Sequence, residues 1–223
     1  MPMTVSRGWL GIAPAILLSA CASGEPPKLE GMAGSQPMAQ ETIGGRPTLV
    51  YRAANADLRK YNRFVIDPVE IYQGADADFG GATEQDKQQM AQFMRSEFVR
   101  ALGSRVASMP GPDVARLHLI LGGLENNVPG VATVSRVAPA GLVMNVINSA
   151  SDRPGSFSGS TTIAGELRDS QTNALLVSFV QKRYPDAMNI GATLSSTDAQ
   201  KAAISDAADA FRKRVDQVQS GLK

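Results

Sequence analysis

The sequence predicts an α+β domain in which a mainly antiparallel sheet carries two longer helices on one face. Three observations lead to this fold class: an amphipathic helical pattern at residues 84–102, a hairpin pattern at residues 160–184, and a second helical pattern from about residue 197. Strand-like segments precede and separate these features, which gives the order strand, helix, strand, hairpin, helix. That order is typical of helices packed on one face of an antiparallel sheet.

The first strand-like segment, residues 59–73, is interrupted in its middle. Pro68 cannot donate a ladder hydrogen bond, so it belongs at a sheet edge or at a bulge. Apolar residues recur with the two-residue period of a strand on both sides of it: Phe64, Ile66, Val69 and Ile71. We therefore expect a strand that breaks at Asp67-Pro68.

The next segment carries the signals of a helix over residues 84–102. Thr83 and Asp86 have the spacing of a capping box at its start, although Asp replaces the usual Glu or Gln. Gly103 supplies a stop signal after the last periodic residue. One mostly apolar face is formed by Met90, Phe93, Met94, Glu97, Phe98 and Leu102.

Residues 113–126 predict a strand with two distinct faces, because Leu117, Leu119 and Leu121 alternate with His118 and Ile120. Farther along the chain, two β-prone runs flank the turn-forming residues Asp169-Ser170-Gln171-Thr172-Asn173. Such residues between two strand patterns predict a β-hairpin.

The last element is a helix that we expect to begin near Thr197, where Thr197 and Gln200 have the spacing of a capping box. Lys and Arg residues occupy the face opposite its apolar side, as in an amphipathic surface helix. The apolar side consists of Ala203, Ile204, Ala207, Phe211, Val215 and Val218.

The N-terminus has the layout of an export signal. Arg7 precedes an apolar run that is too short to span a bilayer as a stable helix, and small residues follow the run. The run ends in Leu18-Ser19-Ala20-Cys21, which resembles the lipobox of bacterial lipoproteins. This resemblance implies cleavage between Ala20 and Cys21 and a covalent lipid on the Cys21 thiol.

A lipid on Cys21 implies a protein that is anchored to a membrane rather than threaded through it. Two or three acyl chains hold a protein stably, because each buried methylene contributes roughly 0.8 kcal/mol. Ala22 follows the lipidated residue where an inner-membrane retention signal would have Asp. The resemblance therefore implies the periplasmic face of the outer membrane.

Three regions follow from these patterns: a signal peptide over residues 1–20, the lipidated cysteine and a flexible tether over residues 21–47, and a single α+β domain over residues 48–223. Gly, Pro, Ser and Gln dominate the tether, where no apolar period is visible.

Removal of Arg7 with the signal leaves 21 basic and 21 acidic side chains in the mature chain. This balance gives no electrostatic reason to expect a nucleic acid partner.

Three segments together resemble a bacterial lipoprotein family catalogued as domain-of-unknown-function 3313: YNRFVIDPVEIY, the helix that follows TEQD, and GELRDSQTNALLVSFVQKR. The sequence departs from that family at Asn173, where similar sequences tend to have Gly. Since Asn tolerates the left-handed backbone conformation, we expect the hairpin to be kept. The family has no known activity, so the resemblance implies a fold and a lipid anchor but no mechanism.

Few chemical sites are compatible with the residues present. His118 is the only histidine and Cys21 is lipidated, which excludes Cys- or His-rich zinc sites. No nucleotide-binding or G-x-S-x-G motif occurs. We therefore assign no catalytic residue, no metal site and no cofactor beyond the covalent lipid, and we favour a protein that is not an enzyme. An envelope hydrolase that uses acidic residues stays an alternative. Its candidate carboxylates are Asp67, Glu70, Glu166 and Asp169.

Residues 126–151 form an apolar segment interrupted by Pro and Gly, and two interpretations of it stay open. The segment is either part of the core or an exposed surface for a partner protein or a lipid chain. The residues of that possible surface are Leu142, Val143, Met144, Val146 and Ile147.

The function that we predict is a membrane-anchored envelope lipoprotein whose domain is a binding or assembly module. Its expected partners are the membrane, through the N-terminal lipid, and another envelope protein. The alternatives are the hydrolase that uses acidic residues and a periplasmic carrier of a small apolar ligand. An enclosed apolar cavity beside residues 140–147 would favour the carrier.

Overall fold

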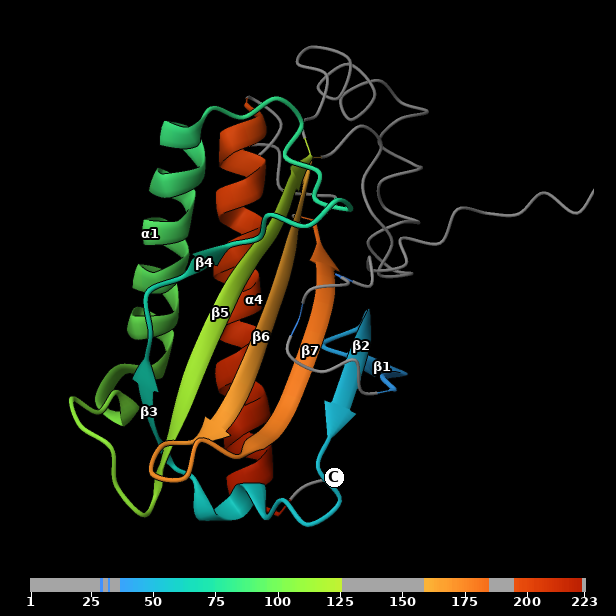
Figure 1. Cartoon of the computed structure of the whole chain (residues 1–223). Helices are drawn as coiled ribbons and strands as arrows, with labels where there is room; N and C mark the ends of the chain where they lie inside the picture. Colours follow the sequence, from blue (N-terminus) through green and yellow to red (C-terminus); the bar gives the residue numbers. More distant parts are fainter. Residues whose placement is uncertain (1–28, 30–31, 33–36, 126–158, 185–194, 222–223) are drawn as a thin grey trace, which may run out of the picture.

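A mixed, mostly antiparallel sheet with two helices on one face forms the part of the chain that the structure describes (Figure 1). The structure is a computed structural model that describes residues 29, 32, 37–125, 159–184 and 195–221. Seven strands pair in the order β1-β2-β7-β6-β5-β3, and β4 also pairs with β5. Their bounds are β1 Ala39–Ile43, β2 Arg46–Arg52, β3 Arg63–Ile66, β4 Glu70–Ile71, β5 Val114–Glu125, β6 Ser160–Asp169 and β7 Leu175–Arg183. The predicted α+β fold class is confirmed.

The structured chain begins earlier than the predicted boundary at residue 48. β1 and β2 form an antiparallel hairpin with Ile43 opposite Arg46, so residues 39–47 belong to the sheet rather than to a tether. Leu29 and Met32 are also buried. The prediction was wrong here because a short edge hairpin carries polar residues and leaves no strong apolar period in the sequence.

The strand break at Pro68 is confirmed. β3 and β4 both pair in parallel with β5, and residues 67–69 separate them at the edge of the sheet. The backbone N–H of Asp67 donates to the carbonyl of Leu117, so the chain stays attached to β5 through the break. Pro68 therefore lies where a missing ladder donor costs no hydrogen bond.

The helix α1 (Glu84–Leu102) has the predicted bounds. The Thr83 hydroxyl accepts a hydrogen bond from the backbone N–H of Asp86, and the Asp86 carboxylate accepts one from the backbone N–H of Thr83. Both halves of the capping box are thus present, and Asp serves in place of Glu. Gly103 follows as the C-cap with a φ of 52°.

The helix α4 (Ser196–Gln219) begins slightly earlier than predicted. Its N-cap is Ser195, whose hydroxyl accepts from the backbone N–H of Asp198, and Thr197 lies inside the first turn. Gln200, expected to complete the cap, is buried and donates to the carbonyl of Glu125 instead. The cap is therefore Ser195 rather than the predicted Thr197.

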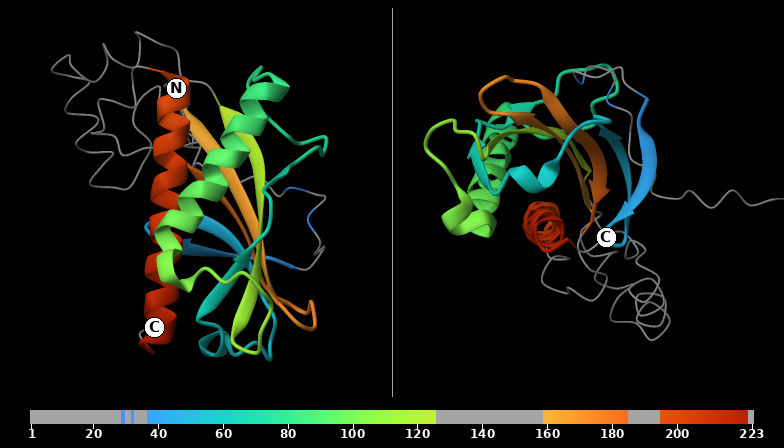
Figure 2. Two further views of the ribbon diagram at one scale, coloured as in Figure 1. Left: turned by 90° about the vertical axis from the view of Figure 1, so that its left-hand side faces the viewer. Right: turned by 90° about the horizontal axis from the view of Figure 1, so that it is seen from below.

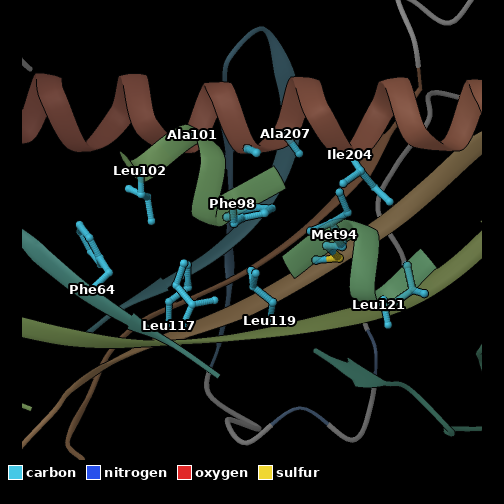
Figure 3. Close-up of a cluster of buried hydrophobic side chains, with 14 of the residues drawn as sticks. Phe64, Met94, Phe98, Ala101, Leu102, Leu117, Leu119, Leu121, Ile204 and Ala207 are labelled. Carbon is cyan, nitrogen blue, oxygen red and sulfur yellow. The ribbon is translucent and has the colours of Figure 1, made fainter. Parts of the chain in front are cut away.

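The main core lies between the two helices and the inner face of the sheet (Figures 2 and 3). Leu117, Leu119 and Leu121 of β5 are fully buried against it, as predicted. Met94 and Phe98 of α1 meet them from the helix layer. Among the described residues, no helix has the length and apolar character needed to cross a bilayer.

A second, smaller apolar cluster lies on the outer face of the sheet. It contains Leu29, Met32, Tyr72, Ile120, Ala164 and Val180. Ile120 thus points away from the helices, as the alternation in β5 predicts. Buried Leu29 and Met32 show that the segment predicted as a tether contributes to the domain.

Candidate ligand-binding groove

Some of the residues singled out in the sequence lie outside the described residues. These are Ala20 and Cys21 of the lipobox, and Leu142, Val143, Met144, Val146 and Ile147 of the apolar segment. The lipid anchor and the surface at residues 142–147 therefore stay predictions.

Two of the four candidate carboxylates contact side chains of β5 on the outer face of the sheet. Asp67 Oδ1 lies 2.7 Å from Nη1 of Arg116, and Glu70 Oε2 lies 3.0 Å from Nε2 of His118. Arg116 and His118 are consecutive outward-facing residues of β5. These pairs join β5 to the interrupted edge strand, which is a structural role for both carboxylates.

The other two carboxylates belong to the β6–β7 hairpin. Glu166 accepts from Arg168 at 2.8 Å. Asp169 accepts from the backbone N–H groups of Gln171 and Thr172 at 2.9 and 2.8 Å, which closes the turn. Within the described ranges, no three His, Cys, Asp or Glu residues are grouped so as to hold a metal ion. Each of the four candidate carboxylates has a hydrogen-bond partner among the described residues.

The structure instead reveals an apolar hollow of about 140 Å³ between α4 and the inner face of β2, β6 and β7. Viewed from below, the sheet curves over α4, and β1 and β2 lie at the end of the curve away from α1 (Figure 2). The apolar residues that line the hollow are Ile43, Val50, Leu58, Phe64, Phe98, Ile163, Leu167, Val177, Phe179, Ala207, Ala210, Phe211, Val215 and Val218.

An aromatic cluster around Phe211 of α4 forms one wall of the hollow. The Phe211 ring centroid lies 5.7, 5.9 and 6.4 Å from those of Phe98, Phe64 and Phe179. Phe179 fits because its cross-strand neighbour is Gly165: a Cβ there would come within 2.8 Å of the ring. The four rings come from the helices α1 and α4 and from the strands β3 and β7. This wall of the hollow is therefore built from both the helix layer and the sheet.

Small residues of α4 leave space in the hollow beside the aromatic cluster. Ala207 and Ala210 face it from α4, where larger side chains would fill it. The turn between β1 and β2 closes toward the helix at Gly44, where an added Cβ would lie 3.4 Å from the Cβ of Ala210. Gly44 has a φ of 57°, which suits a residue without a side chain.

A wider polar hollow of about 590 Å³ adjoins the apolar one. Four residues line both hollows: Ile43, Arg183, Ala210 and Arg214. The two therefore form one continuous feature with an apolar floor and a polar mouth, which we call the α4 groove.

Buried polar side chains support the mouth of the α4 groove. Arg183 donates from Nε to Oε1 of Gln181 at 2.6 Å, and Gln181 donates from Nε2 to Thr48 Oγ1 at 2.6 Å. The guanidinium of Arg46 lies 3.9 Å from the ring centroid of Tyr184. All four polar residues are less than a tenth exposed, and this network fixes two arginines at the mouth.

The lining of the mouth contains four cationic and three acidic residues. Its acids include Glu41, paired with Arg52 at 2.8 Å, and Asp209, paired with Arg100 at 3.2 Å. Neither of these two arginines belongs to the mouth lining. The cations of the lining are Arg46, Arg183, Lys213 and Arg214, and its third acid is Asp206.

Tyr61 lines the apolar hollow without adding a charge to it. Burial raises the pKa of its hydroxyl to about 12, and the hydrogen bond to Asp169 acts in the same direction. The same contact helps to lower the pKa of Asp169, although the backbone N–H of Thr172 has the larger effect. Tyr61 is therefore neutral, and Asp169 ionised, at neutral pH.

Sequence reasoning missed the α4 groove because its lining comes from segments far apart in the chain. Val50, Val177 and Phe211 each read as ordinary core or strand residues, and only the sheet curvature brings them together. Ala207 and Ala210 gave no separate signal, because α4 also buries Ala199, Ala203 and Ala208.

Comparison with solved structures gives low similarity. The PelC dodecamer of Paraburkholderia phytofirmans is 9% identical, with a TM-score of 0.40, over 74% of this chain and 97% of that chain. A protein described as a "putative lipoprotein" from Caulobacter crescentus CB15 is 14% identical, with a TM-score of 0.34, over 74% and 93%. No curated protein matches the sequence significantly.

Comparison with protein families, by contrast, identifies the family of this chain. Residues 28–211 match the family described as "Protein of unknown function (DUF3313)", and this range includes both helices except the last turns of α4. The match begins at residue 28, which agrees with the buried position of Leu29. The chain belongs to the DUF3313 family.

Proposed function

We propose that this protein is a lipid-anchored envelope protein whose domain binds an apolar ligand in the α4 groove. The observation that carries the proposal is the apolar hollow lined by the Phe211 cluster and kept open by Ala207 and Ala210. Ligand sites are typically concave, mostly apolar and supplied with a few polar groups at one end. The α4 groove has each of these properties.

The volume bounds what the apolar part can hold. A cavity of about 150 Å³ lined by aliphatic and aromatic side chains binds benzene. The hollow of about 140 Å³ therefore accommodates roughly a six-carbon group, with the rest of a larger ligand in the polar mouth. The site suits the carrier of a small apolar ligand, although it lies on α4 and the sheet rather than beside the predicted residues 140–147.

The anchor is tested by replacing Cys21 with Ser and labelling cells with a radioactive fatty acid. We expect loss of label and accumulation of unprocessed precursor, because the modified thiol is required before cleavage. Normal maturation of this variant would overturn the lipid anchor and, with it, the periplasmic face of the outer membrane as the location.

The groove is tested by replacing Ala210 with Phe, which adds a ring to the space that Ala210 lines. We expect the variant to fold with equal or higher thermal stability, because filling a cavity adds contacts. Binding of a hydrophobic fluorescent probe to the purified protein should fall, and Ala202→Phe, on the same helix but outside the lining, is the matched control. Equal probe binding by both variants would contradict a ligand site in the groove.

The apolar segment at residues 142–147 keeps a second role open, as a surface for another envelope protein. Photo-crosslinking from these positions in intact cells tests it directly. Reproducible capture of one envelope protein would support an assembly module, and probes that capture nothing while buried would assign the segment to the core.

A further inference from the structure

We infer that Leu29 attaches the N-terminal segment to the outer face of the sheet and so directs this face toward the bilayer. The inference rests on the proposed lipid anchor at Cys21, and it adds the face of the domain that meets the membrane. The helices cover the opposite face of the sheet (Figure 2). The α4 groove, which lies on that face, is then on the side away from the lipid.

Leu29 fills a notch on the outer face of β5 and β6. It is 1% exposed, and its Cδ1 would lie 2.8 Å from a Cβ added to Gly122 of β5. The same Cβ would lie 2.9 Å from Cγ2 of Thr162 on β6. The absence of a side chain at residue 122 therefore provides the space that Leu29 occupies.

The outer apolar cluster supplies further contacts to this segment. Ile120, Ala164 and Val180 come from the adjacent strands β5, β6 and β7 and pack in one cluster with Leu29 and Met32. The backbone N–H of Met32 donates to the carbonyl of Leu29 at 3.1 Å. Two buried side chains and a local turn thus hold the segment against the sheet.

The backbone of Leu29 agrees with a fixed position. Its φ of 44° is in the left-handed region, which few residues with a Cβ adopt. Such a conformation persists where the surrounding structure determines it. The buried side chain of Leu29 supplies those contacts, so Leu29 is the point at which the chain from the lipid is attached to the domain.

The distance from the lipid to this point is short. Leu29 follows Cys21 by only eight residues, whereas the predicted tether extends to residue 47. Eight residues span at most about 26–29 Å when fully extended, and a random coil of eight residues spans about 14–17 Å. Strands lie about 4.8 Å apart and a helix is about 10–12 Å across. The path from Leu29 around the sheet edge to the helix layer is therefore longer than such a coil, which keeps the outer face toward the lipid.

The test lengthens the chain on either side of Leu29. About twenty Gly and Ser residues are inserted after Gly24 in one variant and after Gly34 in the other. The random-coil span between the lipid and Leu29 rises to about 26–32 Å in the first variant and is unchanged in the second. The two variants are matched in added length and composition, so only the attachment at Leu29 distinguishes them.

The measurement is quenching of a fluorophore on the mature lipidated protein in phosphatidylcholine discs that carry copper-loaded chelating head groups. The lipid occupies the thiol of Cys21, so one introduced cysteine is labelled specifically. Ala75→Cys labels an exposed position in the loop whose Ala77 contacts the outer cluster. Gln92→Cys labels an exposed position on α1.

We expect stronger quenching at residue 75 than at residue 92. The insertion after Gly24 should lower quenching at residue 75 about twofold or more, and the insertion after Gly34 should leave it unchanged. Leu29→Asp buries an unpaired charge in the notch and should release the segment. In that background the insertion after Gly34 should lower quenching as well. Leu29→Met, a swap of similar volume, is the control, and thermal melting checks that each variant folds.

The two proposals fail in different ways. Equal loss of quenching with both insertions would overturn the attachment at Leu29 and leave the lipid anchor intact. Equal quenching at residues 75 and 92 would overturn the orientation. A mature protein that carries no lipid and leaves the discs would overturn the anchor and, with it, the membrane-facing surface. Because the two insertions keep Leu29 unaltered, their comparison decides the question even if Leu29→Asp unfolds.

Discussion

The Tyr61 hydroxyl donates a 2.7 Å hydrogen bond to Oδ2 of Asp169, which lies 108 residues farther along the chain. The bond joins the short 3-10 helix Leu58–Lys60 to the turn of the β6–β7 hairpin. Gln219, at the end of α4, donates to the carbonyl of Tyr61 at 2.9 Å. Three elements thus meet at Tyr61, which itself lines the apolar part of the α4 groove.

Replacing Tyr61 with Phe should lower the free energy of unfolding by roughly 1.5–3 kcal/mol, since it removes a hydrogen bond to a charged group. Urea denaturation at neutral pH measures the change. A second readout is specific to the contact: in the native protein one tyrosine should ionise only near pH 12, and that step should vanish in the variant. Tyr51→Phe is the control, and an unchanged tyrosinate titration in Tyr61→Phe would contradict the assignment.

Asp169 should make the domain sensitive to acid. Its pKa is lowered in the folded state, so the unfolded chain binds a proton at a higher pH, near 3.9. The stabilisation is present above that value and is lost as the pH falls through the folded pKa. The stability of the native protein should therefore decrease below about pH 4.

An Asp169→Asn variant should be less stable at neutral pH and should lose part of this acid dependence. Denaturation at several pH values between neutral and strongly acidic measures both effects. Glu84→Gln, at an exposed carboxylate of the first turn of α1, is the matched control. Parallel pH curves for the native protein and Asp169→Asn would contradict the role of Asp169.

Asn173 should be replaceable by Gly but not by Ala. Its φ of 61° confirms the left-handed conformation expected for this turn, in which a residue with an ordinary Cβ costs roughly 1–2 kcal/mol. Asn173→Gly should leave thermal stability unchanged or raise it, whereas Asn173→Ala should lower it. Equal melting of the two variants would argue that the turn relaxes to another conformation.

Gly165 should tolerate no side chain while Phe179 is present. A Cβ at residue 165 would lie 2.8 Å from the Phe179 ring and 3.1 Å from the carbonyl of His118. Gly165→Ala should therefore cost roughly 1–3 kcal/mol, the usual range for overpacking. The double variant Gly165→Ala, Phe179→Leu should recover part of this loss in urea denaturation, and strictly additive losses would contradict the contact.

Local patterns were sufficient to predict most of the fold. The bounds of α1, the break at Pro68, the two faces of β5 and the hairpin around Asp169 each depend on the side-chain period or on a capping or turn residue nearby in the chain. Such signals are local, because propensity, caps and turns act over a few residues. The sequence alone also carries the lipobox at Cys21, which has no structural counterpart among the described residues.

The β1–β2 hairpin and the α4 groove depend on contacts between distant segments, which local sequence patterns do not predict. The β1–β2 hairpin is stabilised because β2 pairs with the distant strand β7, where Thr48 lies opposite Gln181, so its own sequence looks like a tether. The α4 groove exists because the curved sheet leaves space beside Ala207 and Ala210, and because Arg183 and Arg214 come to the same edge from β7 and α4. Burial and charge at such a site arise from contacts between distant segments, and only the folded chain determines them.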